Sequence, residues 1–222
     1  MLTVALFDFS GVPYQELHAL LPKDEQKRLV HGKSEAYRRA SGAGRALLFS
    51  LYRAIMGTDA PKVFSTRLGA PYFATSAARF SISHDDTLVA VAISPDGAEV
   101  GVDVQGLASL DRYSDERLRA LKERFSLLSP PEDPPPCHIL RATLSDSRFT
   151  FVSMPLCTRE NNDRLRFLGD FTYTEALLKA KGTGFSDSKE KVRFAPEHRG
   201  GTVILKDEVF GTHVLSFCIK NK

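Results

Sequence analysis

The sequence is poor in cysteine and in charge of one sign. Its 222 residues include three cysteines, Cys137, Cys157 and Cys218, without C-x-x-C spacing. They therefore indicate neither a zinc site nor a disulfide framework, and their odd number favours a reducing compartment. The formal net charge is only +3. Because nucleic-acid binding needs a concentrated basic patch, we expect no nucleic-acid partner, whereas an anionic small molecule or an acidic protein stays compatible.

The amino terminus lacks the features of a leader or a membrane span. Residues 1–8 read MLTVALFD, with no basic residue and an apolar run too short for a signal peptide or a transmembrane helix. We expect this segment to be the first strand of a cytoplasmic protein that has no membrane partner. A content of 42% apolar and 26% charged residues is typical of a globular protein with a real core.

The stretch 79–105 contains the strongest strand signals. Two apolar runs, Leu88–Ile93 and Val100–Val104, are separated by a P-D-G turn signal, so the pattern predicts a β-hairpin. In the second run the valines face a core, which leaves Asp103 and Gln105 together on the opposite face. Residues two apart on a strand are separated by roughly 6 to 7 Å, so a carboxylate and an amide oxygen point at the same space.

A shorter alternation, F-S-I-S-H, ends at His84 just before an Asp-Asp turn. We therefore expect His84, with Ser83 beside it, at a strand end near a loop, where functional sites are usually built. Taken singly, an aspartate on a strand is more often a solvated residue, and a lone histidine is more often a structural hydrogen-bond partner. Neither residue type is a strong candidate without a second motif.

Residues 34–56 are predicted to form the longest helix of the first half. Their apolar side chains recur at intervals of three and four, as in an amphipathic helix. Another side carries Arg38, Arg39, Ser41 and Arg45. A basic face of this kind is often only solvated. Alternatively it binds phosphate, because arginines contact phosphate through two hydrogen bonds and a nearby hydroxyl completes the shell.

The stretch 170–184 contains the second candidate motif, D-F-T-Y-T-E-A-L-L-K-A-K-G-T-G. Its Ala, Leu and Lys residues favour helix and its two glycines end one, so we predict a helix of about three turns that begins at Asp170. Thr172, Glu175 and Lys179 would share one face of that helix. Taken alone, Glu175 and Lys179 are an ordinary surface pair four residues apart.

Together these motifs resemble the surfactin-type 4′-phosphopantetheinyl transferases. F-S-I-S-H followed by V-G-V-D-V resembles their first signature, and F-T-Y-T-E-A-L-L-K-A-K-G-T-G is similar to their second, W-x-x-K-E-A-x-x-K-x-x-G-x-G. The segment R-A-S-G-A-G-R at 39–45 is similar to their basic R-x-S-x-A-G-R segment, and residues 67–73 are similar to their G-K-P-Y loop. Two signatures in the expected order are much harder to meet by chance than one.

The chain departs from these signatures at several charged positions. Ala70 stands in place of the lysine of G-K-P-Y, and Thr174 in place of the first lysine of the second signature. Phe171 replaces the tryptophan, and Gln105 stands where many members have a third acid. Fewer charges would therefore surround a pyrophosphate, so we expect lower activity or a narrower choice of partner.

The resemblance implies an α+β fold with α/β-type halves that form two pseudo-symmetric subdomains. Each subdomain would be a small sheet packed on a long helix, with residues 1–105 in one, residues 106–222 in the other, and the active site in the cleft between them. A chain with both halves is expected to be a monomer. The proline-rich segment at about 126–169 is predicted to be a largely irregular insertion, with 148–154 as its best strand candidate.

The resemblance also implies an activity, that of a holo-[acyl-carrier-protein] synthase in fatty acid biosynthesis or secondary metabolism. Such enzymes transfer the 4′-phosphopantetheine of coenzyme A to a serine of an acyl, polyketide or peptidyl carrier protein and release adenosine 3′,5′-bisphosphate. They use Mg²⁺ or Mn²⁺. One alternative is a non-catalytic module, derived from such a transferase, that binds coenzyme A or a carrier protein. Another is an unrelated phosphate-binding α/β protein.

Site residues follow from matching this chain to the two signatures. The metal ligands would be Asp103, Glu175 and Gln105, and the catalytic residues would be Glu175, Lys179 and His84. The residues that contact coenzyme A would be Arg39, Ser41, Arg45, Arg67, Ser83, His84 and Lys179.

Overall fold

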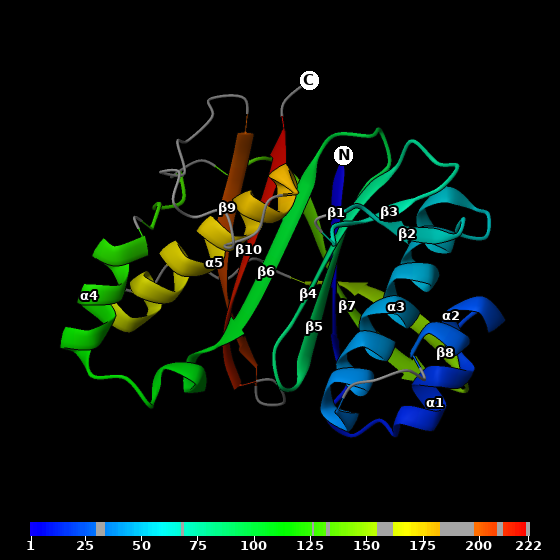
Figure 1. Cartoon of the computed structure of the whole chain (residues 1–222), viewed down its shortest axis with the longest axis horizontal. Coiled ribbons are helices and arrows are strands. Elements are labelled where there is room, and N and C mark those ends of the chain that lie inside the picture. Colours follow the sequence, from blue (N-terminus) through cyan, green and yellow to red (C-terminus); the bar gives the residue numbers. More distant parts are fainter. Residues whose placement is uncertain are drawn as a thin grey trace.

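A computed structural model describes residues 1–29, 34–67, 69–125, 127–131, 134–154, 162–182, 198–207 and 211–220. The described chain is a mixed α+β protein, so the predicted class is confirmed (Figure 1). No helix in this part of the chain is long and apolar enough to cross a membrane.

Three sheets contain the strands. A five-stranded sheet has the order β4 (Arg79–His84), β5 (Leu88–Ser94), β1 (Leu2–Asp8), β7 (Cys137–Ser145) and β8 (Arg148–Ser153). A three-stranded sheet has the order β6 (Val100–Gly106), β10 (Gly211–Lys220) and β9 (His198–Asp207). A small sheet pairs β2 (Val63–Ser65) with β3 (Pro71–Phe73). All neighbouring strands are antiparallel except β1 and β7, which run parallel.

Two long helices and several short ones complete the fold. The long ones are α3 (Glu35–Met56) and α5 (Asp163–Lys181), and the short ones are α1 (Tyr14–Ala19), α2 (Lys23–Leu29), the 3-10 turn η1 (Leu107–Leu110) and α4 (Asp115–Phe125). The predicted long helix is confirmed as α3. Ser34 caps its start, where the hydroxyl accepts a hydrogen bond from the N–H of Tyr37, and Gly57 in a left-handed conformation caps its end.

The two larger sheets pack face to face between the two long helices (Figure 1). Alternate residues of β1 divide between two cores: Ala5 and Phe7 pack with α3, whereas Val4 and Leu6 pack with the valines of β6. On the far side, α5 covers the three-stranded sheet. This layering follows from the period-two pattern of the strands, since each apolar face must be covered.

Two serines join the edges of these sheets. The hydroxyl of Ser81 accepts a hydrogen bond from the N–H of Val102 at 3.1 Å, and that of Ser83 accepts one from the N–H of Val104 at 3.4 Å. The side chains of β4 thus satisfy backbone donors of β6 that would otherwise be buried without partners. As a result, Asp103 lies beside the end of β4.

The predicted hairpin between the two apolar runs is wrong. Both strands form, and the turn between them is confirmed by Gly97, which has φ of 83°. However, β5 pairs with β4 and β1, while β6 pairs with β10 in the other sheet. Because β5 is buried on both faces, its second apolar face needs a covering layer, and β6 belongs to the sheet that supplies it.

The segment predicted as a largely irregular insertion contains regular structure. β7 and β8 form a hairpin that extends the sheet of β1, and β8 confirms the predicted strand near 148–154. Residues 126, 132–133 and 155–161 of this segment lie outside the described residues. The division of the chain at Gln105 stays a prediction, although strands pair across it: β1 with β7, and β6 with β10.

The second motif lies on a longer helix than predicted. α5 begins at Asp163 rather than at Asp170, because the Asn162 side chain accepts hydrogen bonds from the N–H groups of Arg164 and Leu165. Asp170 is therefore inside the helix, where it pairs with Lys122 of α4. The helix ends at Gly182, as predicted, while Gly184 lies outside the described residues.

Candidate functional site

Asp103 is the centre of the candidate site. It lies on the face of β6 opposite the valines, and only 3% of its surface is exposed. Its Oδ1 atom accepts hydrogen bonds from the hydroxyl of Ser83 at 2.6 Å and from the ammonium of Lys179 at 2.7 Å. The first and second motifs are therefore in direct contact, through residues of β4, β6 and α5.

This contact depends on a glycine in β6. A Cβ atom on Gly101 would lie 1.7 Å from the carbonyl oxygen of Ala176, so no other residue fits without moving α5. The missing side chain lets the helix backbone approach the strand closely. Lys179, one turn after Ala176, can then reach Asp103.

The other carboxylate oxygen of Asp103 has no hydrogen-bond partner among the described residues. Oδ2 is buried, although it carries part of a negative charge. Buried polar atoms nearly always have partners, so an orphaned carboxylate oxygen indicates a missing ligand or ion. A hard cation would satisfy it.

Lys179 uses all of its donors within the protein. Besides Asp103, its Nζ atom donates to the hydroxyl of Ser83 at 2.9 Å and to the carbonyl of Val102 at 3.2 Å. Its side chain is still 28% exposed. The ammonium therefore lies at the boundary between the buried carboxylate and the solvent.

Glu175 lies one turn before Lys179 on the same face of α5. Burial first, and then the charge of Asp103, raises the pKa of Glu175 to about 7 against the opposing charge of Lys179. The two carboxylates are thus near enough to interact. A carboxylate with this pKa is partly protonated at neutral pH, which is a property of groups that exchange protons in enzyme sites.

His84 belongs to the same electrostatic cluster. Burial lowers its pKa, and so does the charge of Lys179, while a hydrogen bond to the main chain of Asp85 and the charges of Asp85 and Asp103 act in the opposite direction. The net lowering makes the imidazole neutral at pH 7. The structure therefore brings together five of the predicted site residues, namely Ser83, His84, Asp103, Glu175 and Lys179.

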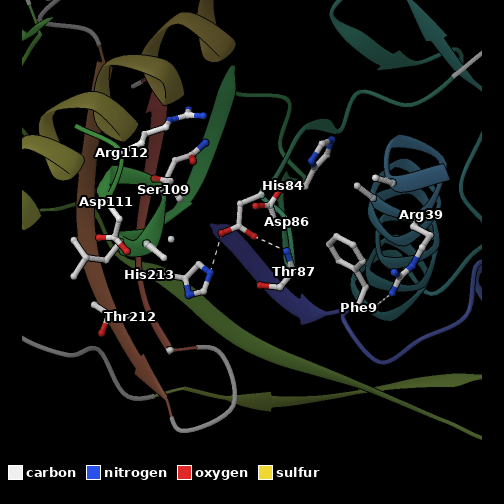
Figure 2. Close-up of a pocket in the computed structure, with 18 of the residues that line it drawn as sticks. Phe9, Arg39, His84, Asp86, Thr87, Ser109, Asp111, Arg112, Thr212 and His213 are labelled. Atoms are coloured by element: carbon white, nitrogen blue, oxygen red, sulfur yellow. Dashed lines mark hydrogen bonds and ion pairs between the residues drawn. The ribbon is translucent and has the colours of Figure 1, made fainter. Parts of the chain in front are cut away.

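A large pocket opens beside this cluster. Its volume is about 1180 Å³, and it is lined by α3, the β4–β5 turn, the end of β6, η1 and the start of β10. His84, Gln105 and Arg39 are among the lining residues. Figure 2 shows Arg39 and Phe9 on one side, Asp111 and Arg112 on the other, and His84 between them. The pocket thus meets the candidate site at His84 and Gln105, whereas Asp103, Glu175 and Lys179 are not among the described residues that line it.

The predicted phosphate-binding face of α3 is only partly found at the pocket. Arg39 lines it, but its Nη2 atom donates to the carbonyl oxygens of Phe9, Ser10 and Val12. Arg45 forms an ion pair with the buried Glu25. Neither Ser41 nor Arg45 is among the described residues that line the pocket.

The remaining predicted positions lie further out or point elsewhere. Arg67 is exposed in the loop between β2 and β3. In the same loop, Ala70 is close to the end of α5, 3.8 Å from the place of a Cβ on Gly182. Thr174 is fully buried and its hydroxyl accepts a hydrogen bond from the N–H of Leu128 at 2.9 Å. Phe171 stacks on Phe167 with ring centroids 6.4 Å apart.

Asp85 and His213 form a further pair at the pocket that sequence reasoning missed. The Nε2 atom of His213 donates to Oδ2 of Asp85 at 2.8 Å. No local pattern could have found the pair, because the two residues are far apart in the chain and meet only through the packing of the two sheets. The Asp-Asp turn was the sole signal, and it indicates only a turn.

A divalent cation fits this site through a small set of oxygen ligands. In the described ranges no three or more His, Cys, Asp and Glu side chains are grouped to hold a metal ion. Mg²⁺ needs fewer, since it takes one or two carboxylates and completes its shell with water and phosphate oxygens. The orphaned Oδ2 of Asp103, the nearby Glu175 and the amide of Gln105 fit this requirement.

No protein-family model matches this sequence, and no curated protein matches it. The function is therefore inferred from the site.

Proposed function

We propose that the protein is a 4′-phosphopantetheinyl transferase that acts on a carrier protein. The single observation that carries this proposal is the 2.7 Å contact between Asp103 and Lys179. It brings two sequence motifs, each resembling a signature of that class, into one buried cluster. The activity would convert an apo acyl, polyketide or peptidyl carrier protein into its holo form in the cytoplasm. We also propose a monomer with no nucleic-acid or membrane partner.

In this proposal Asp103 and Glu175 hold Mg²⁺ or Mn²⁺, with Gln105 as a neutral ligand or a partner for a bound water. When bound, the ion neutralises charge on the pyrophosphate of coenzyme A. The fit rests on the orphaned oxygen of Asp103 and on the electrostatic coupling between the two carboxylates.

The side chains of the cluster have the properties that the transfer needs. The serine oxygen of the carrier would attack the β-phosphorus, and the bond from that phosphorus to the bridging oxygen would break, releasing adenosine 3′,5′-bisphosphate. Glu175 would accept the serine proton, for which a pKa of about 7 is well suited. Lys179, which would exchange one of its three protein acceptors for phosphate, and neutral His84, with Ser83 beside them, would donate to the pyrophosphate oxygens as charge moves to the leaving group.

The pocket beside the cluster would receive coenzyme A and the carrier serine. Arg39 lines it, and Arg67 is an exposed cation in the neighbouring β2–β3 loop. We retain Arg39, Ser41 and Arg45 as proposed contacts of the 3′-phosphate. Both arginines would then exchange protein partners for phosphate, Arg39 its carbonyl oxygens and Arg45 its bond to Glu25.

The proposal is tested by mixing the protein with coenzyme A, Mg²⁺ and a set of apo carrier proteins. Mass spectrometry should find a carrier that gains one phosphopantetheine group. Asp103→Ala and Glu175→Ala should each slow the transfer by at least about a hundredfold, with unchanged circular dichroism. Arg79→Ala, exposed at the far end of β4, is the matched control and should transfer as the wild type does. Substantial turnover in either site variant removes that residue from its role.

A non-catalytic module remains the second candidate, since every donor of Lys179 is already engaged within the protein. Such a module would bind coenzyme A or a carrier protein without transfer. Calorimetric titration with each ligand, combined with the mass assay, separates the two functions.

A further inference from the structure

Asp85 and His213 form a buried pair at the edge of the pocket that the proposed mechanism does not use. The Nε2 atom of His213 lies 2.8 Å from Oδ2 of Asp85, and the two side chains are 7% and 12% exposed. The pair joins the two large sheets, because Asp85 directly follows β4 and His213 lies near the start of β10. Figure 2 shows His213 facing the turn that carries Asp86 and Thr87.

Asp85 also organises the turn between β4 and β5. Its Oδ1 atom accepts hydrogen bonds from the N–H groups of Thr87 at 2.9 Å and Leu88 at 2.8 Å. Burial acts to raise the pKa of Asp85, but the hydrogen bonds from His213, Leu88 and Thr87 outweigh burial and hold the pKa below its ordinary value. Oδ1 of Asp85 therefore stabilises the turn, and Oδ2 accepts the hydrogen bond from His213.

The backbone of β6 covers this contact closely. A Cβ atom on Gly106 would lie 3.2 Å from both Oδ2 of Asp85 and Nε2 of His213. The Nδ1 atom of His213 is buried and makes no hydrogen bond with the described residues. The hydrogen bond to Asp85 therefore orients the imidazole of His213, and the nearby backbone of Gly106 leaves the ring little room to rotate.

The pair is directly connected to His84. The ring of His84 hydrogen-bonds to the main chain of Asp85, and besides burial, the charge of Lys179 lowers the pKa of His84. Any movement of the turn would therefore change the distance between the imidazole of His84 and the ammonium of Lys179. The hydrogen bond between Asp85 of the turn and His213 of β10 would oppose that movement.

We propose that Asp85 and His213 are positioning residues, which hold His84 at the phosphate-binding part of the site by tying the β4–β5 turn to β10. This inference rests on the proposed function, in which His84 donates to the pyrophosphate of coenzyme A. In this role neither Asp85 nor His213 would contact the reacting atoms, although both line the pocket. Their loss should thus weaken the binding of coenzyme A more than it slows the transfer itself.

Three variants test the inference. His213→Leu removes the donor but keeps an apolar volume, whereas His213→Gln keeps an N–H group that can reach Asp85. Asp85→Asn keeps Oδ1 for the turn and replaces the oxygen that accepts the hydrogen bond from His213. This variant therefore still tests the inference if His213→Leu does not fold. Arg79→Ala, at the other end of β4, is the control.

Two measurements are made on the full-length protein. The first is the position of the His84 ring signals in ¹H–¹⁵N spectra at one fixed pH, without ligand. The second is the KM for coenzyme A and the kcat of carrier modification. We expect His213→Leu and Asp85→Asn to shift or broaden the His84 signals and to raise KM by about tenfold with kcat within about threefold of the wild type, since a charged buried hydrogen bond is lost. His213→Gln should recover most of both changes.

His84 signals and KM that stay as in the wild type in His213→Leu and Asp85→Asn would overturn the inference. So would a failure of His213→Gln to differ from His213→Leu, because a purely packing role predicts that both are equally impaired. If the wild-type protein modifies no carrier, the proposed function fails. The His84 signals of the ligand-free variants then still decide whether the pair positions that ring.

Discussion

The ammonium of Lys179 lies 2.7 Å from the Oδ1 atom of Asp103 and thus links α5 to β6. The carboxylate is 4% exposed and the lysine side chain 28%, so the pair is buried on one side and solvated on the other. Oδ1 of Asp103 also accepts a hydrogen bond from the Ser83 hydroxyl. If Lys179 is removed, the buried carboxylate of Asp103 still bears the cost of its desolvation but has lost its cation. Removing Lys179 and removing Asp103 should therefore affect stability differently.

Replacing Lys179 by Met should lower the free energy of unfolding by about 1 to 2 kcal/mol, because Asp103 then keeps its charge without an ammonium. The double variant Asp103→Asn/Lys179→Met should recover part of that loss, since it removes the unpaired charge as well. Urea unfolding of the wild type, the two single variants and the double variant measures the coupling. Losses in the double variant that equal the sum of the single ones would mean that the contact contributes nothing to stability.

Glu175 should titrate near neutral pH in the metal-free protein. Its pKa is raised from an ordinary value of 4.5 to about 7, first by burial and then by the charge of Asp103, against the effect of Lys179. Asp103→Asn should therefore lower this pKa, and Lys179→Met should raise it. A ¹³C carboxyl titration of the wild type and both variants checks the two directions. Shifts of the same sign in both variants would contradict the electrostatic assignment.

The raised pKa of Glu175 also predicts how the stability of the protein depends on pH. As pH rises from 4.5 to 7, the unfolded chain releases the Glu175 proton before the folded protein does, so the contribution of this group is complete at low pH and is lost in that window. Glu175→Gln removes the effect. The variant should thus gain stability relative to the wild type between pH 5 and pH 8, as urea unfolding at several pH values would measure. A difference that stays constant across this range would show that Glu175 does not titrate there.

Local patterns predict many of the elements but not the pairing of the strands. The apolar runs of β5 and β6 and the helical period of α3 follow from side-chain periodicity alone. The partner of β5 does not, because both of its faces are apolar and a P-D-G turn serves a hairpin and a crossing between sheets equally well. The early start of α5 was missed for a related reason: Asn162 is as good a cap as Asp170, and its choice depends on what the helix packs against.

The sequence predicts which side chains of the candidate site share a face of a strand or helix. It does not predict how closely the strand and the helix approach each other. The strand period separates Asp103 from the valines, and the helix period brings Glu175 and Lys179 to one side. Their contact across β6 and α5 depends on Gly101, which the pattern treats as any other residue on that face. The ion pair of Arg45 could not be predicted, because its partner, Glu25, lies on another helix that only the tertiary structure brings close.

Gly101→Ala should remove at least about 3 kcal/mol of stability, because the added methyl group meets a helix backbone that cannot move aside. The clash is with the carbonyl oxygen of Ala176, 1.7 Å from the Cβ position. Gly11→Ala is the matched control, since no atom lies within 4 Å of its Cβ position, and it should be nearly neutral. Thermal unfolding followed by circular dichroism measures both. A stable Gly101→Ala protein would mean that α5 lies further from β6 than described.

Thr174→Lys tests whether the lysine expected at this position would restore charge to the site. Thr174 is fully buried and bonded to Leu128, so we expect Thr174→Lys to lose about 3 kcal/mol or more without any gain in transfer rate, since it buries an unpaired charge. Thr174→Val keeps the shape and should lose about 1 to 2 kcal/mol through the unpaired N–H of Leu128. The exposed Thr150→Val is the control, with a change below about 0.5 kcal/mol. Faster transfer by a Thr174→Lys protein of normal stability would show instead that this position faces the substrate.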